Sequence, residues 1–233
     1  MVMKWQWISG SGLKLLAVVS MVVDHLAAFI WQGDPFWMTR LFKVGSHLIT
    51  PYYIARYFGR LAFPLFAFLI VEGFIHTHSR RGYGRNLFIF ALISEIPWNL
   101  IHSGTLLYWG QNVFFTLFFG FLALCAIEYL KDEKIKMGVS LIGLLVFSYF
   151  FRADYNFVGV SFIIMLYLLR ENVFFQAVVG SAMLPTRWIA GLAFIPISMY
   201  NGKRGFIRGT VAKYCFYAFY PIHLLVIYLL TVL

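Results

Sequence analysis

Long apolar runs alternate with short polar connections along almost the whole chain. The runs predict nine membrane-spanning helices, at about 12–32, 59–77, 86–103, 112–130, 137–151, 155–170, 173–185, 188–200 and 213–233. Several runs between 137 and 200 are shorter than the roughly 20 residues that cross a bilayer upright, so we expect some of them to be broken, re-entrant or merged. The pattern therefore predicts an all-α, polytopic membrane helix bundle of about nine transmembrane helices, within a range of about eight to ten.

One stretch, residues 34–58, does not fit the pattern of apolar runs. It mixes Trp37 and several tyrosines with the cations Arg40, Lys43 and Arg56, a blend typical of the headgroup interface rather than of the hydrocarbon core. We therefore predict an interfacial or re-entrant segment there, on the outer side of the membrane. If the stretch crosses the membrane instead, one more span is added and the topology after it inverts.

The composition supports an integral membrane protein without a soluble domain. Of the 233 residues, 61% are apolar and only 12% are charged, which leaves too little polar surface to cover a soluble globule. The chain is therefore expected to form a single domain over residues 1–233. The first run lacks a small-residue cleavage site and many similar runs follow it, which favours a retained span over a signal peptide. Cys125 and Cys215 lie within apolar runs far apart in the sequence, and we expect them to be packing residues.

The distribution of lysine and arginine predicts the orientation, because cytoplasmic loops carry the positive excess. With the N-terminus in the cytoplasm, thirteen of the 19 cations are inside and six are outside. The inner set is Lys4, Lys14, Arg80, Arg81, Arg85, Lys131, Lys134, Lys136, Arg170, Lys203, Arg204, Arg208 and Lys213; the outer set is Arg40, Lys43, Arg56, Arg60, Arg152 and Arg187. This bias explains most of the net charge of +10 without nucleic acid as a partner, and it places the C-terminus outside.

The first apolar run contains two ionisable neighbours, Asp24 and His25. A charged side chain near the bilayer centre costs about 3 kcal/mol or more, so such residues usually have a function. Lys14 lies eleven residues before His25, which places both side chains on one helix face about 16 Å apart. Asp24 projects about 100° away from His25 and is therefore poorly placed to orient the same ring.

Three further titratable residues lie in or near the predicted spans. Glu72 is near the inner end of the second run, which also contains Pro64, and Glu95 is about mid-membrane in the third. A buried carboxylate is costly unless it is paired. His223 lies near mid-depth of the last run, after Pro221. For His223, an interhelical hydrogen bond is as plausible as a functional role, because membrane bundles use such bonds often.

A basic segment, residues 76–85, connects the second and third runs. It contains Arg80, Arg81 and Arg85 together with two glycines, and guanidinium groups and backbone amides are ligands for phosphate. The alternative is that this predicted loop only reflects the positive-inside rule. The remaining histidines, His47, His76, His78 and His102, are expected at the surface. The HExxH, GxSxG, CxxC and P-loop patterns do not occur, so metalloprotease, serine hydrolase and NTPase functions have no support, and no metal is expected.

In their order along the chain, several motifs resemble the TraX family. They are Ser20-Met-Val-Val-Asp-His, Gly59-Arg-Leu-Ala-Phe-Pro-Leu-Phe-Ala-Phe-Leu-Ile-Val-Glu-Gly-Phe, Arg80-Arg, Phe90-Ala-Leu-Ile-Ser-Glu-Ile-Pro-Trp-Asn and Tyr220-Pro-Ile-His. The resemblance implies a multi-spanning protein of the bacterial inner membrane, in a family whose best-known activity is acetylation of the N-terminal amine of conjugative pilin. A weaker similarity in layout connects Lys14, His25, Gly73-Phe74 and the arginines with the membrane acyltransferase-3 family, which has Arg in place of Lys14. Lysine keeps the charge but loses the bidentate fork.

The resemblance and the spacing together predict a membrane acyltransferase that moves an acetyl group from cytoplasmic acetyl-CoA to an amine or hydroxyl. The acceptor would be a pilin-like peptide, a glycan or a lipid headgroup. His25 would act as a base or carry the acyl group transiently, with Glu72 or Glu95 orienting its ring. The residues expected to take part are His25, Asp24, Glu72 and Glu95 in catalysis, Lys14, Arg80, Arg81 and Arg85 in binding acetyl-CoA, and Arg60 and His223 in binding the acceptor.

Two other functions remain open from the sequence. A proton-coupled transporter or flippase would use the buried acids and histidines as a relay and would need no CoA. Inverted internal repeats would support it, but none is visible. An assembly partner of an envelope machine would use the polar residues only to hold helices together. That role leaves the basic segment without a task.

Overall fold

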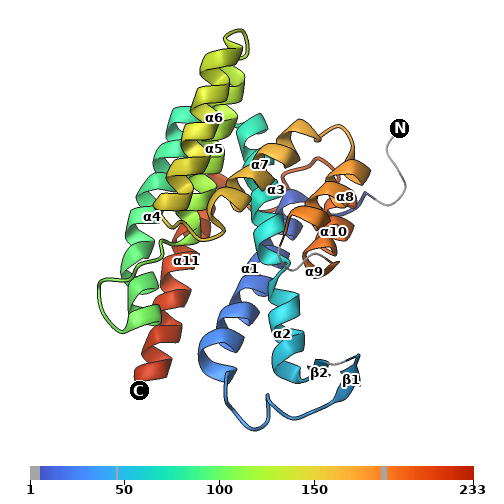
Figure 1. Ribbon diagram of the computed structural model, residues 1–233, viewed down its shortest axis with the longest axis vertical. Helices are drawn as coiled ribbons and strands as arrows, with labels where there is room; N and C mark the ends of the chain where they lie inside the picture. Colours follow the sequence, from blue (N-terminus) through green and yellow to red (C-terminus); the bar gives the residue numbers. More distant parts are fainter. Residues whose placement is uncertain (1–5, 46, 185–187) are drawn as a thin grey trace.

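The computed structural model describes residues 6–45, 47–184 and 188–233, and it is a helix bundle (Figure 1). Within these ranges, nine helices have nine or more residues. They are α1 (Gly10–Leu26), α2 (Pro51–Gly59), α3 (Ala62–His76), α4 (Arg80–Ser103), α5 (Val113–Tyr129), α6 (Lys134–Phe150), α7 (Asn156–Leu168), α8 (Val173–Met183) and α11 (Gly209–Val232). Shorter elements are a π-helical turn after α1, η1 (Ala27–Trp31), the helices α9 (Trp188–Gly191) and α10 (Phe194–Ser198), and the strands β1 (Phe42–Val44) and β2 (His47–Ile49).

The prediction of a polytopic, all-α membrane bundle is confirmed. Three segments within the described residues are long and apolar enough to cross a membrane: Gly10–Trp31, Pro51–His76 and Gly209–Val232, with 22, 26 and 24 residues. The predicted run at 188–200 is broken into α9 and α10, as the shortness of that run indicated. Lys4 and Arg187, which were assigned to opposite sides of the membrane, lie outside the described residues.

The stretch 34–58 contains more regular structure than its composition suggested. It forms the antiparallel hairpin β1–β2 and then all of α2 except its last residue, Gly59; α2 packs against α1. Thr50 caps α2 by accepting a hydrogen bond from the Tyr53 amide at 3.3 Å, and Pro51 occupies the first turn, where a missing N–H costs nothing. The second apolar segment therefore begins at Pro51 rather than near 59.

A break at Arg60 and Leu61 separates α2 from α3. Pro64 lies in the interior of the apolar segment Pro51–His76 and in the first turn of α3. Because proline cannot donate to the carbonyl four residues earlier, which is that of Arg60, the chain restarts its helix at this point. The apolar segment is consequently two helices in succession.

The basic segment 76–85 is also more helical than expected. Ser79 accepts a hydrogen bond from the Gly82 amide at 3.0 Å and caps α4. Arg80, Arg81 and Arg85 therefore lie on the first turns of α4 instead of in a loop. Their positions on the helix determine which way each guanidinium faces.

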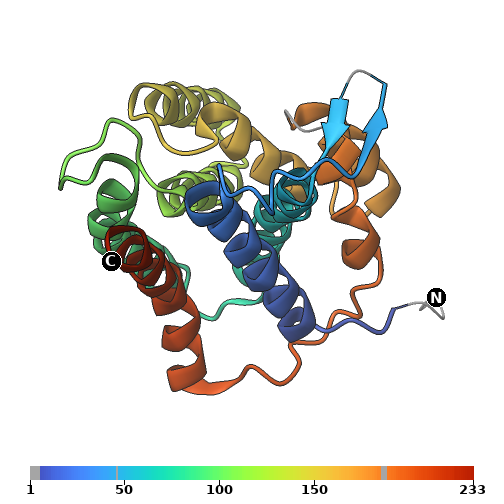
Figure 2. The same cartoon turned by 90° about the horizontal axis from the view of Figure 1, so that it is seen from below.

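Helix α1 lies between α3 and α11 and also packs against α2. Figure 2 shows α1 near the middle, with α3 on one side and α11, which packs closely against α4, on the other. The starts of α1, α4 and α11 and the end of α3 meet at one end, which we call the basic end, defined by Lys14, Arg85, Arg204 and Lys213. The hairpin and the C-terminus lie toward the opposite end, which we call the hairpin end (Figure 1).

Candidate functional site

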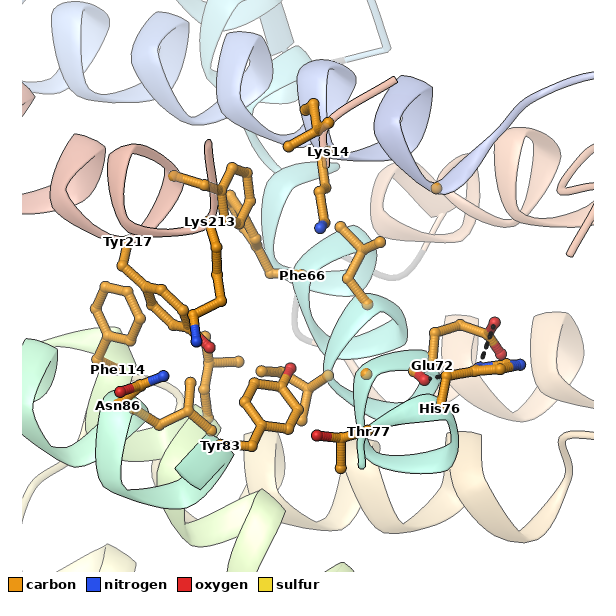
Figure 3. Close-up of a pocket in the computed structure, with 18 of the residues that line it drawn as sticks. Lys14, Phe66, Glu72, His76, Thr77, Tyr83, Asn86, Phe114, Lys213 and Tyr217 are labelled. Atoms are coloured by element: carbon orange, nitrogen blue, oxygen red, sulfur yellow. Dashed lines mark hydrogen bonds and ion pairs between the residues drawn. The ribbon is translucent and has the colours of Figure 1, made fainter. Parts of the chain in front are cut away.

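A cavity of about 640 Å³ extends into the bundle from the basic end. Its walls come from α1, α3, α4, α5, α11 and the segment before α11. Four cations line it, Lys14, Arg85, Arg204 and Lys213, and Glu72 is the one carboxylate among the described lining residues. In Figure 3, the side chains of Lys14 and Lys213 point into the same space between the helices. This end of the cavity is suited to an anion.

The other end of the cavity is buried and aromatic. Met21, Phe114, Tyr217 and Tyr220 line it, and each is at most 8% exposed. Met21 lies one helical turn before His25 on α1, and the lining residue Phe219 lies one turn before His223 on α11. Four residues of α-helix correspond to about 6 Å along the axis. The cavity therefore points from the basic end toward the two histidines.

The structure joins His25 directly to His223. The Nδ1 atom of His25 is 2.7 Å from the Nε2 atom of His223, and the rings are nearly parallel, at 6° with centroids 5.0 Å apart. The Nδ1 atom of His223 is 3.0 Å from the Phe219 carbonyl oxygen. The interhelical hydrogen bond considered for His223 is therefore present, and its partner is the residue of greatest interest on α1.

Asp24 faces a different helix. Nη1 of Arg56, on α2, forms an ion pair with Oδ1 of Asp24 at 2.8 Å and donates a hydrogen bond to the Asp24 carbonyl at 3.1 Å. The approach of α2 to α1 is close because Gly59 lies directly against the Asp24 side chain. Arg56 was not among the expected site residues. The sequence Thr50-Pro51 is a helix-start signal that predicts α2. Arg56 would then be a cation on a helix, and a carboxylate partner for it could have been sought.

The two glutamates lie away from the His25 ring. Glu95 accepts hydrogen bonds from both the backbone and the side chain of Asn112, the backbone contact being 3.0 Å long, so it holds the start of α5. Glu72 is at the basic end, with Oε2 3.7 Å from Nδ1 of His76. The ring position that sequence reasoning gave to Glu72 or Glu95 is taken by His223.

Of the four cations expected to bind acetyl-CoA, two line the cavity and two lie outside it. Lys14 and Arg85 line the cavity. Arg80 instead stacks on the Phe74 ring at 4.3 Å and is 3.6 Å from Glu128, whereas Arg81 is exposed on α4 and is not among the lining residues. Arg204 and Lys213 line the cavity but were expected only to mark the cytoplasmic side. The sequence did not predict this role, because Arg204 and Lys213 are far from α4 along the chain.

Two other expected positions are now placed. Arg60 follows α2 and lies beside the side chain of Tyr155, in the turn between α6 and α7. His102 is not a simple surface residue: its ring packs against Trp98 and Tyr108, with centroids 4.0 and 4.8 Å away. Each of these polar side chains therefore has an aromatic neighbour.

The fold and the cavity define a polytopic membrane helix bundle with a basic, aromatic-walled cavity that points toward a buried histidine pair. The chain belongs to the TraX family, because a sequence model of that family, described as "TraX protein", matches residues 9–231. It is similar to the probable fimbrial assembly protein FimC, serogroup H1, of Dichelobacter nodosus, with 28% identity over 91% of each chain. No solved structure matches the chain. The resemblance to the TraX family drawn from the motifs is confirmed.

Proposed function

We propose that this TraX-family protein is a membrane-embedded acetyltransferase that takes its acetyl group from acetyl-CoA and acts in fimbrial or pilin assembly. The observation that carries the proposal is the cavity itself, with four cations toward one end and the His25–His223 pair beyond the other. The assembly role draws on the name of the similar protein from Dichelobacter nodosus. The acetyl transfer draws on the family resemblance and on the fit of the cavity.

The lining fits the two ends of acetyl-CoA. The phosphates need cations, and Arg85, Arg204 and Lys213 supply them at the basic end. The pantetheine arm is long and largely apolar, which suits the aromatic walls. Lys14, near the start of α1, and His25 are eleven residues apart, or about 16 Å along the helix. The arm would enter along α1 and present the thioester toward His25.

In this proposal His25 handles the proton of the transfer. The amine or hydroxyl of the acceptor attacks the thioester carbonyl carbon while Nε2 of His25 takes its proton. The carbon–sulfur bond then breaks, and the CoA thiolate receives that proton from His25. The products are the acetylated acceptor and free CoA, so atoms and charge balance.

The acceptor would approach from the hairpin end, on the side opposite the cations. We propose a pilin-like peptide as the first acceptor to test, ahead of a glycan or a lipid headgroup, because the similar protein is named for fimbrial assembly. Arg60 would help to hold it there. This arrangement assumes a bacterial inner membrane with the N-terminus in the cytoplasm.

The test is the binding and slow hydrolysis of acetyl-CoA by the purified protein in detergent. Arg85 and Arg81 lie on the same helix and carry the same charge, but only Arg85 lines the cavity. A charge-assisted hydrogen bond contributes about 1.5–3 kcal/mol, so Arg85→Ala should weaken acetyl-CoA binding by about 10- to 100-fold. Arg81→Ala is the matched control and should change binding by less than about 2-fold. His25→Ala should bind normally but lose hydrolysis.

Two outcomes would count against the proposal. Equal effects of Arg85→Ala and Arg81→Ala would mean that the cavity is not the donor site. A folded, monodisperse protein that does not bind acetyl-CoA would shift the function to a proton-coupled transporter. The specific observation that favours this second candidate is the presence of two polar pairs, Asp24–Arg56 and His25–His223, inside one bundle.

A further inference from the structure

A chain of hydrogen bonds connects α1 to the backbone of α11 through two histidines. A carbonyl oxygen only accepts, so the contact between Nδ1 of His223 and the Phe219 carbonyl, at 3.0 Å, requires a proton on that nitrogen. In a neutral ring, Nε2 of His223 is then an acceptor. The nitrogen of His25 that faces it at 2.7 Å must therefore be the donor. The proton of a neutral His25 lies on Nδ1, and its Nε2 lone pair is free.

We infer that His223 is a positioning residue that fixes His25 in the tautomer with a free Nε2 atom. The catalytic use of this tautomer rests on the proposed function, whereas the tautomer itself follows from the hydrogen bonds alone. The positioning role also replaces the expected role of His223 in binding the acceptor. The two rings meet edge to edge in nearly one plane, with 6° between the planes and the centroids 5.0 Å apart, so the hydrogen bond is well aligned. His223 is only 8% exposed, so water competes little for its Nε2 atom.

These hydrogen bonds leave His25 with an unprotonated Nε2 atom, which is what a general base needs. A free histidine side chain in water prefers the other tautomer, in which Nε2 carries the proton and cannot accept another. When Nε2 of His25 takes the acceptor proton, the resulting imidazolium keeps its hydrogen bond from Nδ1 to His223 and is stabilised by it. The Phe219 carbonyl keeps His223 in the accepting orientation. In serine hydrolases a carboxylate holds the histidine in this way, and here a second imidazole would do so.

The first test is nitrogen NMR of the protein with ¹⁵N-labelled histidine in mildly alkaline buffer, without acetyl-CoA. The chain has six histidines, and the His25 signals are those missing from His25→Gln. We expect the His25 ring to show a protonated Nδ1 and an unprotonated Nε2. In His223→Leu the ring should move toward the opposite tautomer, whereas His223→Gln keeps a side-chain oxygen as acceptor and should retain the original one. A wild-type His25 with the proton on Nε2 would overturn the inference, even if His223→Leu fails to fold.

The second test uses turnover, and it separates positioning from acceptor or donor binding. His223→Leu should lower the kcat of acetyl-CoA hydrolysis by about 10-fold or more and leave KM within about 2-fold. His223→Gln should recover most of the loss. A His223→Leu variant with normal kcat would refute the positioning role. Because the NMR result needs no substrate, absence of hydrolysis in the wild type would refute the proposed function and leave the tautomer result intact.

Discussion

Substitution of Arg56 should lower the free energy of unfolding strongly, because Arg56 neutralises Asp24. The pair is 2.8 Å long, and the two side chains are 22% and 17% exposed. Arg56 also donates a hydrogen bond to the Asp24 carbonyl at 3.1 Å, so its removal takes away both this hydrogen bond and the ion pair. We therefore choose Arg56→Met and Asp24→Asn, singly and together, as the perturbation.

The magnitude follows from the burial of the pair. Removing one partner of a fully buried ion pair costs about 3–5 kcal/mol. Because some solvent reaches both side chains, we expect the lower end, about 3 kcal/mol for Arg56→Met. Asp24→Asn keeps an oxygen that accepts from Arg56 and should cost about 2 kcal/mol. The double variant leaves no unpaired charge, so it should cost about 3 kcal/mol rather than the sum, a coupling energy of about 2 kcal/mol.

The assay is unfolding of each variant by SDS in mixed micelles, followed by far-ultraviolet circular dichroism. Arg40→Met is the control, because Arg40 is exposed and should change the free energy of unfolding by no more than about 0.5 kcal/mol. If the effects of the two single variants add within about 0.5 kcal/mol, Asp24 and Arg56 do not interact and the reasoning is refuted.

Two further stability predictions use glycine and asparagine pairs as internal controls. Gly59→Ala should lower the thermal stability strongly, because a Cβ there would overlap the Asp24 side chain, while Gly138→Ala in α6 meets open space and should be neutral or stabilising by up to about 1 kcal/mol. Equal melting temperatures for the two variants would contradict the close packing of α1 and α2. Asn112→Ala should cost about 2 kcal/mol, because it removes a helix cap and also a partner of the half-buried Glu95 carboxylate. Asn172→Ala removes a cap of the same kind at an exposed site and should cost about 1 kcal/mol or less, so an equal loss in both would show that the carboxylate contact contributes nothing.

The helices of this protein are predictable from its sequence because a backbone in lipid must satisfy its own hydrogen bonds. Apolar runs therefore identify α1, α5 and α11 nearly at their observed bounds. The prediction fails where capping rather than hydrophobicity determines a boundary. Thr50 with Pro51 starts α2, and Ser79 starts α4, in segments whose aromatic and basic composition indicated an interface and a loop.

The candidate site was predictable as a set of residue types but not as a set of pairs. Burial of a charge in an apolar run is visible in one sequence, and it identified Asp24, His25 and His223. Which side chains meet depends on how helices face one another, and His25 and His223 are 198 residues apart in the chain. For the same reason the cavity cations Arg204 and Lys213 were not associated with Lys14.

The adjacency of Asp24 and His25 explains how one helix serves two partners. Neighbouring residues on an α-helix project about 100° apart. Asp24 accordingly faces α2 and pairs with Arg56, while His25 faces α11 and pairs with His223. A rotation of α1 about its axis would break both pairs together, so each pair fixes the direction of the other. The Asp24–Arg56 ion pair thus determines where the His25 ring lies relative to the deep end of the cavity, without touching the ring itself.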